Sequence, residues 1–195
     1  MTSSSNRPRH RRNRNQAGYS GRFRGLDTHP SPPPRRFEEF EVGQSATLER
    51  LVSAADVDDF AALTGDNNPL HVDDAYASEV GMGRRVVHGM LTAGFVSTVI
   101  GTMLPGPGAL WLSEQFAFRA PVRIGDTIRA EVRIRRISPA TRILLLEVAV
   151  TNQRGTVVLD GEATVQVLDT VMEMADPIDV RNVVVTGAGR GIGAA

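Results

Sequence analysis

One stretch decides the fold: Gly89-Met-Leu-Thr-Ala-Gly-Phe-Val-Ser-Thr-Val-Ile-Gly-Thr-Met-Leu104. It contains no charged residue, and its side chains are apolar or small on nearly every helical face, which predicts a long helix surrounded by protein. Pro105-Gly-Pro-Gly108 ends the helix, because proline cannot continue it. The stretch is shorter than the ~20 apolar residues that a membrane span needs. We therefore expect a soluble, cytoplasmic protein with a buried central helix.

Downstream of this helix, four strand-like runs follow: Ala109–Arg119, Thr127–Ile137, Arg142–Gln153 and Thr156–Leu168. Turn-forming residues separate them, so the pattern predicts an antiparallel meander. A sheet wrapped around one long helix is an α+β arrangement. Its open edge predicts pairing into a homodimer.

Upstream of the central helix, the sequence predicts a strand over Ala46–Val52 and a helix over Ala54–Thr64. Ser53 is a natural N-cap for that helix, with Asp56 three residues later. Gly65 can end the helix in a left-handed conformation. These signals define the helix by local chemistry alone.

The segment between the two helices is expected to be mostly irregular. Pro69 forbids a helix over Asp66–His71, by this reasoning, and pushes Asn68 into extended geometry. A short helical turn is predicted over Asp73–Ser78, with Asp73 and Asp74 as its caps.

Charge divides the chain into two parts. Residues 1–36 contain nine Arg and one Asp, a formal charge of +8, whereas residues 37–195 carry −8. The first part has few apolar side chains to offset its ordering entropy, which predicts a disordered Arg-rich tail. A start codon placed too far upstream or an organelle transit peptide would also explain it. Only Tyr19 and Phe23 could stack on bases there, so nucleic-acid binding has little support.

Two residue types are missing from the chain, cysteine and lysine. Disulfides, thiolate catalysis and cysteine–metal sites are therefore excluded, as is Schiff-base chemistry on lysine.

The chemistry-bearing segment is Thr64-Gly-Asp66-Asn-Asn-Pro-Leu-His71. On a straight helix a separation of five residues is ~500° of rotation, so Asp66 and His71 would not share a face. On a loop bent by Gly65 and Pro69 they can converge on one water, with His as general base and Asp orienting the water or sharing its proton. The alternatives are that Asp66 caps the following turn and that His71 is a packed histidine.

A second site is predicted where Val86-Val-His88-Gly89-Met90 opens the central helix. The first amides of a helix have no internal partner, and a Gly there lets a ligand oxygen approach closely. Gly89 would then form an oxyanion site for a carbonyl. His88 is interpreted as structural more readily than as a substrate contact. Arg84 and Arg85 could meet nucleotide phosphates, although exposed arginines are more often solvated.

Three spaced motifs together resemble the MaoC-like family of (R)-specific enoyl-CoA hydratases. They are Asp66-x-Asn68-Pro-x-His71, Val87-His88-Gly89-Met90, and Phe118-x-x-Pro121 with Gly125-Asp126, and the resemblance covers 37–170. It implies a hot-dog fold, a dimer, Asp66 and His71 as the groups that bind and activate water, and the Gly89 amide as receiver of a thioester carbonyl. Asn68 would hold the loop, and Asn68 and His88 are the remaining candidates for substrate binding.

The resemblance implies reversible syn addition of water to a trans-2-enoyl thioester, giving a (3R)-hydroxyacyl thioester in fatty-acid metabolism. Neither a metal nor a redox cofactor is expected, because the thioester already acidifies the α-position. Acyl-CoA and acyl-carrier protein share the phosphopantetheine arm, so the motifs do not choose between them. Rival functions are a thioesterase on the same fold and a non-catalytic acyl-thioester-binding module.

The last residues form a second, separate motif. After a linker over 171–181 comes Asn182-Val-Val-Val-Thr-Gly-Ala-Gly-Arg-Gly-Ile-Gly-Ala-Ala195, a strand followed by a Gly-rich turn. It resembles the start of a short-chain dehydrogenase/reductase, in which Gly187, Gly191 and Gly193 would approach the pyrophosphate of a dinucleotide. By the same resemblance, Arg190 favours NADP. We interpret the segment as the incomplete beginning of a reductase in a hydratase–reductase fusion, with NADP relevant only if that domain is present.

Overall fold

The computed structural model describes residues 33–168 of the chain. The predictions made for residues 1–32, for the linker over 171–181 and for the Gly-rich segment over 182–195 lie outside the described residues. Within residues 33–168, none of the helices is both long and apolar enough to cross a membrane.

Five strands form one antiparallel sheet: β1 (Ser45–Leu51), β2 (Ala109–Phe118), β3 (Thr127–Ser138), β4 (Ile143–Asn152) and β5 (Val157–Val167). A short 3-10 turn, η1 (Phe37–Glu39), precedes them, and a second, η2 (Pro139–Thr141), joins β3 to β4. The order across the sheet is β1-β3-β4-β5-β2. Only β3, β4 and β5 form a meander. The prediction of a four-stranded meander was therefore wrong for β2, which pairs with β5 and leaves β1 and β2 as the two edges.

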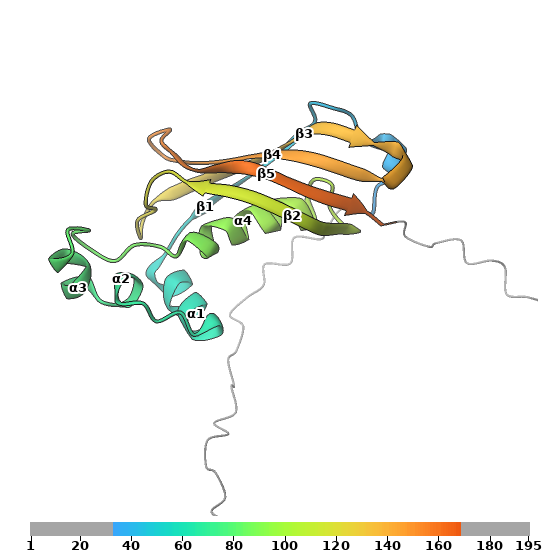
Figure 1. The fold of residues 1–195 in the computed structure, drawn as a ribbon. Coiled ribbons are helices and arrows are strands. Elements are labelled where there is room, and N and C mark those ends of the chain that lie inside the picture. The colour runs from blue at the N-terminus through green and yellow to red at the C-terminus, as the bar shows by residue number, and fades with distance from the viewer. Residues whose placement is uncertain (1–32, 169–195) are drawn as a thin grey trace, which may run out of the picture. The chain divides into compact units, whose positions relative to one another are not determined.

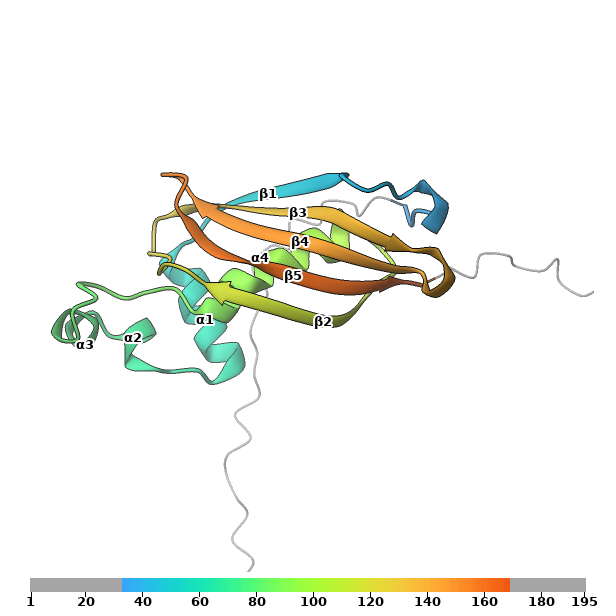
Figure 2. The same ribbon diagram turned by 45° about the horizontal axis from the view of Figure 1, so that its top comes forward.

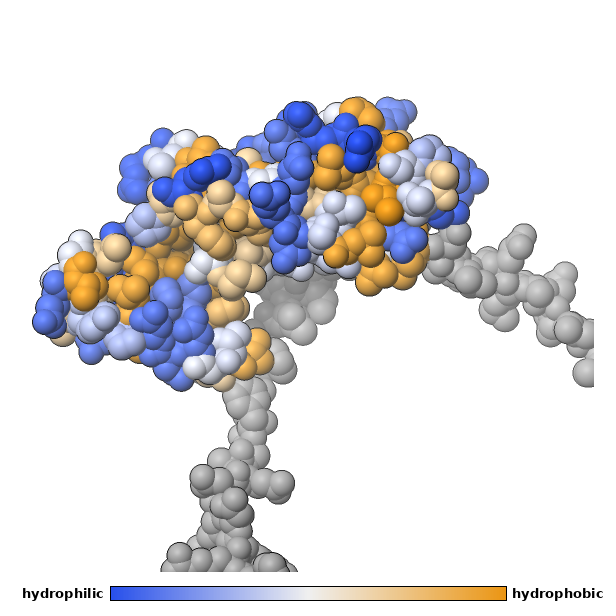
Figure 3. All heavy atoms as spheres, in the orientation of Figure 1, coloured by the Kyte–Doolittle hydropathy of each residue, from blue (hydrophilic) through white to orange (hydrophobic). Residues whose placement is uncertain are grey.

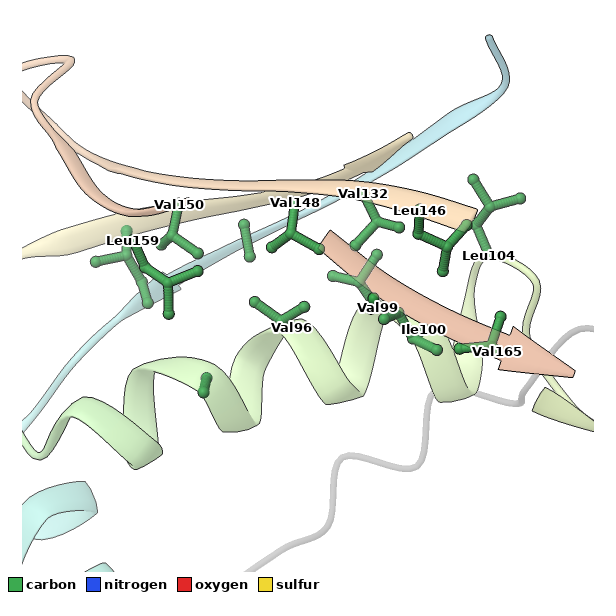
Figure 4. Packing of buried hydrophobic residues seen from close by; sticks show 14 of the residues in the cluster. Val96, Val99, Ile100, Leu104, Val132, Leu146, Val148, Val150, Leu159 and Val165 are labelled. Carbon is green, nitrogen blue, oxygen red and sulfur yellow. The ribbon is translucent and has the colours of Figure 1, made fainter. Parts of the chain in front are cut away.

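The long helix α4 (Gly89–Thr102) lies along one face of this sheet (Figures 1 and 2). Its apolar side chains meet those of the strands in a shared core, which Figure 4 shows from close by. Val96, Val99 and Ile100 of α4 are fully buried against residues such as Leu146 and Val165 of the sheet. The predicted α+β class, with a sheet packed on one long helix, is confirmed.

One expectation about α4 was wrong. Its other face is not covered by protein within residues 33–168, since Gly94, Ser97, Thr98 and Gly101 are all exposed. These residues are small but only weakly apolar, so leaving them in water costs little hydrophobic free energy.

The first helix, α1 (Ala54–Thr64), has the predicted boundaries. Ser53 and Asp56 form a reciprocal capping box, and Gly65 ends the helix with a φ of 79°. Burial raises the pKa of the Asp56 carboxyl, but hydrogen bonds from Ser53 and the Arg50 guanidinium outweigh burial and bring that pKa below its ordinary value.

Two short helices follow, α2 (Pro69–Val72) and α3 (Asp74–Glu79). The prediction that Pro69 forbids a helix was wrong, because Pro69 is the first residue of α2, where its missing N–H has no intrahelical acceptor to lose. Asn68 before it has φ −54° and ψ 127°, a non-helical backbone conformation of the kind that a residue before proline favours. Helices α1 to α3 lie at the end of the molecule where α4 begins (Figures 1 and 2).

Candidate active site

Asp66 lies on the exposed loop between α1 and α2. One oxygen, Oδ1, accepts a hydrogen bond from the Asn68 N–H at 3.3 Å, and the Asn68 side chain in turn accepts one from the Leu70 N–H at 3.1 Å. One carboxylate oxygen of Asp66 therefore caps the following turn, as the alternative interpretation of this residue predicted. Asn68 holds the loop, which is the role that its sequence position predicts.

His71 lies on α2, and its ring is oriented by the main chain of a distant segment. Its Nδ1 lies 2.8 Å from the carbonyl oxygen of Val86. Because a carbonyl can only accept, Nδ1 carries the proton in this contact and Nε2 of the neutral ring keeps its lone pair. The ring is thus held in the tautomer that a general base needs.

The structure brings three of the predicted residues together. One side-chain nitrogen or oxygen from each of Asp66, His71 and His88 lies within 4.8 Å of the others. Two groups that each bond the same water at ~2.8 Å with a tetrahedral angle are about 4.6 Å apart. The spacing of the Asp66 carboxylate and the His71 ring therefore suits a single water held between them.

His88 connects Asp66 and His71 to the start of α4. It is only 1% exposed, and its Nε2 donates to the main-chain oxygen of Asp66 at 3.0 Å. Its ring stacks on His71 at 3.8 Å between centroids and packs against Phe60 at 4.9 Å. These contacts favour the structural interpretation of His88. Its buried Nδ1, which has no partner among residues 33–168, remains available as an acceptor.

Gly89 follows His88 directly and is the first residue of α4, so its N–H has no intrahelical acceptor. It borders a cavity of about 290 Å³ that is otherwise lined by Val87, Thr92 of α4, Val158 of β5 and the segment 118–122. A side chain at Gly89 would meet the Phe118 ring, since an added Cβ would lie 3.0 Å from its nearest atom. The absence of a side chain at Gly89 therefore leaves room for the Phe118 ring at the start of α4, and the preceding residue, His88, links this position to Asp66 and His71.

Asp and His side chains also bind metal ions. Within residues 33–168, Asp66, His71 and His88 are the cluster close enough together to hold one. Coordination through the Nε2 of His88 would break its hydrogen bond to the Asp66 carbonyl.

Sequence reasoning missed the residues that orient this site. Phe60 supports the His88 ring, the Val86 carbonyl sets the His71 tautomer, and Arg85 donates from Nε to the main-chain oxygen of His71. Asp74, predicted as a cap, instead accepts from the Arg85 N–H at 2.8 Å, whereas Asp73 caps α3 as predicted. None of these pairings has a local signal, because the partners come from separate segments of the chain.

Fold and site together define an α+β protein with an Asp–His pair tied to the start of its central helix. The family model described as "MaoC like domain" matches residues 38–154. The chain belongs to this MaoC-like family, as the three motifs predicted.

Named relatives are similar over most of their length. The chain is 45% identical to the 3-hydroxybutyryl-CoA dehydratase of Methylorubrum extorquens, over 74% of this chain and 90% of that protein. It is also 45% identical to the (R)-specific enoyl-CoA hydratase of Rhodospirillum rubrum, over 67% and 90%. Among solved structures, the (R)-hydratase from A. caviae superimposes with a TM-score of 0.65 at 39% identity, over 67% of this chain and 99% of that one. This similarity confirms the hot-dog fold.

Proposed function

We propose that this protein is a (3R)-specific enoyl-CoA hydratase, which adds water to trans-2-enoyl-CoA or catalyses the reverse dehydration. The observation that carries the proposal is the convergence of Asp66 and His71 within 4.8 Å, with the His71 ring held so that Nε2 has a free lone pair. The names of the relatives at 45% identity support the same reaction class.

In the proposed reaction, Asp66 and His71 hold one water between them. His71 Nε2 takes a proton as the water oxygen bonds to C3 of the enoyl group, and the electron pair of the C2–C3 double bond moves toward the thioester carbonyl. The Gly89 N–H donates to that carbonyl as it takes on enolate character. Return of a proton from the Asp66–His71 pair to C2, on the same face, completes syn addition.

The proposed hydration needs no redox cofactor, because no bond change transfers electrons to or from an external acceptor. It also needs no metal as Lewis acid, because the thioester already acidifies C2 and the Gly89 amide supports the developing charge. The substrate is proposed to be a soluble acyl-CoA or acyl-carrier-protein thioester in the cytoplasm.

Purified protein with crotonyl-CoA and with butyryl-CoA tests the proposal. Loss of the enoyl absorbance with crotonyl-CoA, giving the (3R)-hydroxy product and no free thiol, is the expected result. Release of thiol from both substrates would identify a thioesterase instead. Tight binding of crotonyl-CoA with neither reaction would identify a non-catalytic thioester-binding module.

We also propose a homodimer, formed through the β2 edge of the sheet. That edge strand presents unpaired main-chain groups and exposes Leu110 and Leu112 at 45% and 49%. Apolar side chains at the surface on this side of the molecule are visible in Figure 3. Sedimentation equilibrium should give twice the chain mass, and Leu112→Glu should shift the protein toward the monomer; a monomeric wild type would contradict the proposal.

A further inference from the structure

The segment from Ala62 to Val80, which carries Asp66 and His71, has almost no hydrophobic core of its own. Between Ala62 and Val80 the only buried residue is Ala77. Helix α2 has four residues, none of them buried, and so short a helix is not stable in isolation. The position of the His71 ring must therefore be maintained by contacts from another part of the chain.

The neighbouring segment Arg84–Val87 is firmly attached to the folded core. Val86 and Val87 are 8% and 5% exposed, and the Val87 N–H donates to the Val122 carbonyl at 2.9 Å. From this position Val86 contacts α2 twice, through its N–H to the Leu70 carbonyl and through its carbonyl to His71 Nδ1. The segment is thus a fixed support beside α2.

Arg85 adds one link from this segment to each of the helices α1, α2 and α3. Its Nε donates to the His71 carbonyl in α2, its guanidinium pairs with Asp58 in α1, and its main-chain N–H donates to Asp74, the first residue of α3. The planar guanidinium has donors on two sides, so it can hold a carbonyl and a carboxylate at once in fixed geometry.

The Arg85 side chain is also unusual in its burial. It is 16% exposed, whereas the other ion-paired arginines of residues 33–168 are 30% to 82% exposed. Exposed ion pairs contribute little to stability, because water competes with them. The partly buried Arg85 guanidinium, which is bonded to the main chain of His71, is shielded from that competition. It can therefore keep His71 in a fixed position.

We propose that Arg85 is a positioning residue that fixes the His71 ring in its Nδ1–H tautomer, with Nε2 directed at the water. The kinetic consequence rests on the proposed hydratase function, whereas the effect on the tautomer does not. Arg85 is proposed to act through His71, because its Nε donates to the His71 carbonyl and its Nη2 pairs with Asp58.

The kinetic test compares Arg85→Met with Arg85→Lys and with the matched control Arg135→Met. Arg135 forms an exposed ion pair with Glu147 at 3.4 Å and lies on β3. Arg85→Met should lower kcat about tenfold or more with little change in KM, since small displacements of a catalytic group are costly. Arg85→Lys should recover part of the rate, and Arg135→Met should leave kcat unchanged.

Two substrates separate positioning from phosphate binding. With crotonyl-CoA and with crotonyl-pantetheine, which lacks the nucleotide, Arg85→Met should lower kcat by the same factor. An increase in KM confined to crotonyl-CoA would overturn the proposal and identify Arg85 as a contact of the nucleotide phosphates.

The tautomer is read directly from 15N-histidine-labelled protein by long-range 1H–15N correlation at about pH 8.5, above the ordinary pKa of histidine. His71 should show the Nδ1–H form in the wild type and a mixture of forms in Arg85→Met, while His88 keeps its Nε2–H form as an internal control. An unchanged His71 signal in Arg85→Met and Arg85→Lys would overturn the proposal.

The spectrum also decides the role of Arg85 independently of activity. If the wild type does not hydrate crotonyl-CoA, the proposed function fails, but the His71 tautomer still shows whether Arg85 positions the ring. Asp58→Asn, which removes only the ion pair, gives a milder variant should Arg85→Met not fold.

Discussion

The sheet with α4 and the segment from Ala62 to Val80 are held in place by different forces. In the first region, side chains such as Val96, Ile100 and Leu146 are completely removed from water. In the second, most residues from Ala62 to Val80 are exposed, and polar links from the segment Arg84–Val87 maintain their positions. The candidate catalytic pair lies in the second region. The contrast indicates that packing supplies most of the stability, while a segment held mainly by polar links carries the candidate catalytic pair.

The largest expected effect is on the packed region. Ile100→Ala should lower the free energy of unfolding by about 2–5 kcal/mol, because it removes buried methyl groups from a core that cannot fully collapse. Chemical denaturation monitored by circular dichroism measures the change. The Ile100→Ala protein that stays folded should keep a kcat near that of the wild type. A large loss of kcat in this folded protein would show that the core also controls the candidate catalytic segment, which contradicts the comparison.

The converse effect is expected at His71. His71→Gln should lower kcat by roughly 100-fold or more, as loss of a general base does, and Asp66→Asn should do the same. Both side chains lie on a segment with little buried surface, so the unfolding midpoint should move little. Steady-state kinetics on crotonyl-CoA together with thermal unfolding checks both parts, and full hydratase rate in both variants would refute the assignment.

A smaller effect is expected where the two regions meet, at Gly89. Gly89→Ala should lower kcat about tenfold, because the added methyl group lies against Phe118 and crowds the amide that would receive the carbonyl. Phe118 is 53% exposed and can move, so stability should change little. The kcat of Gly89→Ala is compared with that of the double variant Gly89→Ala, Phe118→Ala. Partial recovery of kcat in the double variant supports crowding between the new methyl group and the Phe118 ring. No recovery would mean that the methyl group lowers kcat without the help of Phe118.

The smallest effect concerns the cap of α1. The pKa of Asp56 is lowered in the folded state, so its contribution to stability is present above the unfolded pKa of ~3.9 and is lost as pH falls through the lower folded value. Asp56→Asn should therefore cost about 1 kcal/mol or less near neutral pH, similar to the loss of a helix cap. Its stability should also decline less than that of the wild type below about pH 4. Denaturation curves from pH 2 to pH 7 measure this; parallel pH profiles would contradict it.

The parts of the fold that were predictable from the sequence have local causes. Ser53, Asp56 and Gly65 set the boundaries of α1 through contacts within a few residues, and those boundaries were predicted correctly. Pro69 was misinterpreted because a proline that ends one element can equally begin the next. The position of β2 beside β5 was missed, since the pairing of distant strands depends on the whole sheet and not on the turn that follows each strand.

The sequence by itself determined that Asp66 and His71 belong to one bent segment after α1, that Gly89 opens the central helix, and that an antiparallel sheet packs on this helix. Only the tertiary structure decided how these groups act together. The His71 tautomer depends on the Val86 carbonyl, 15 residues along the chain, and the Asp66 loop is held by His88, 22 residues away. Hydrogen bonds of this kind form only after the core has brought separate segments together, and therefore no local pattern in the sequence encodes them.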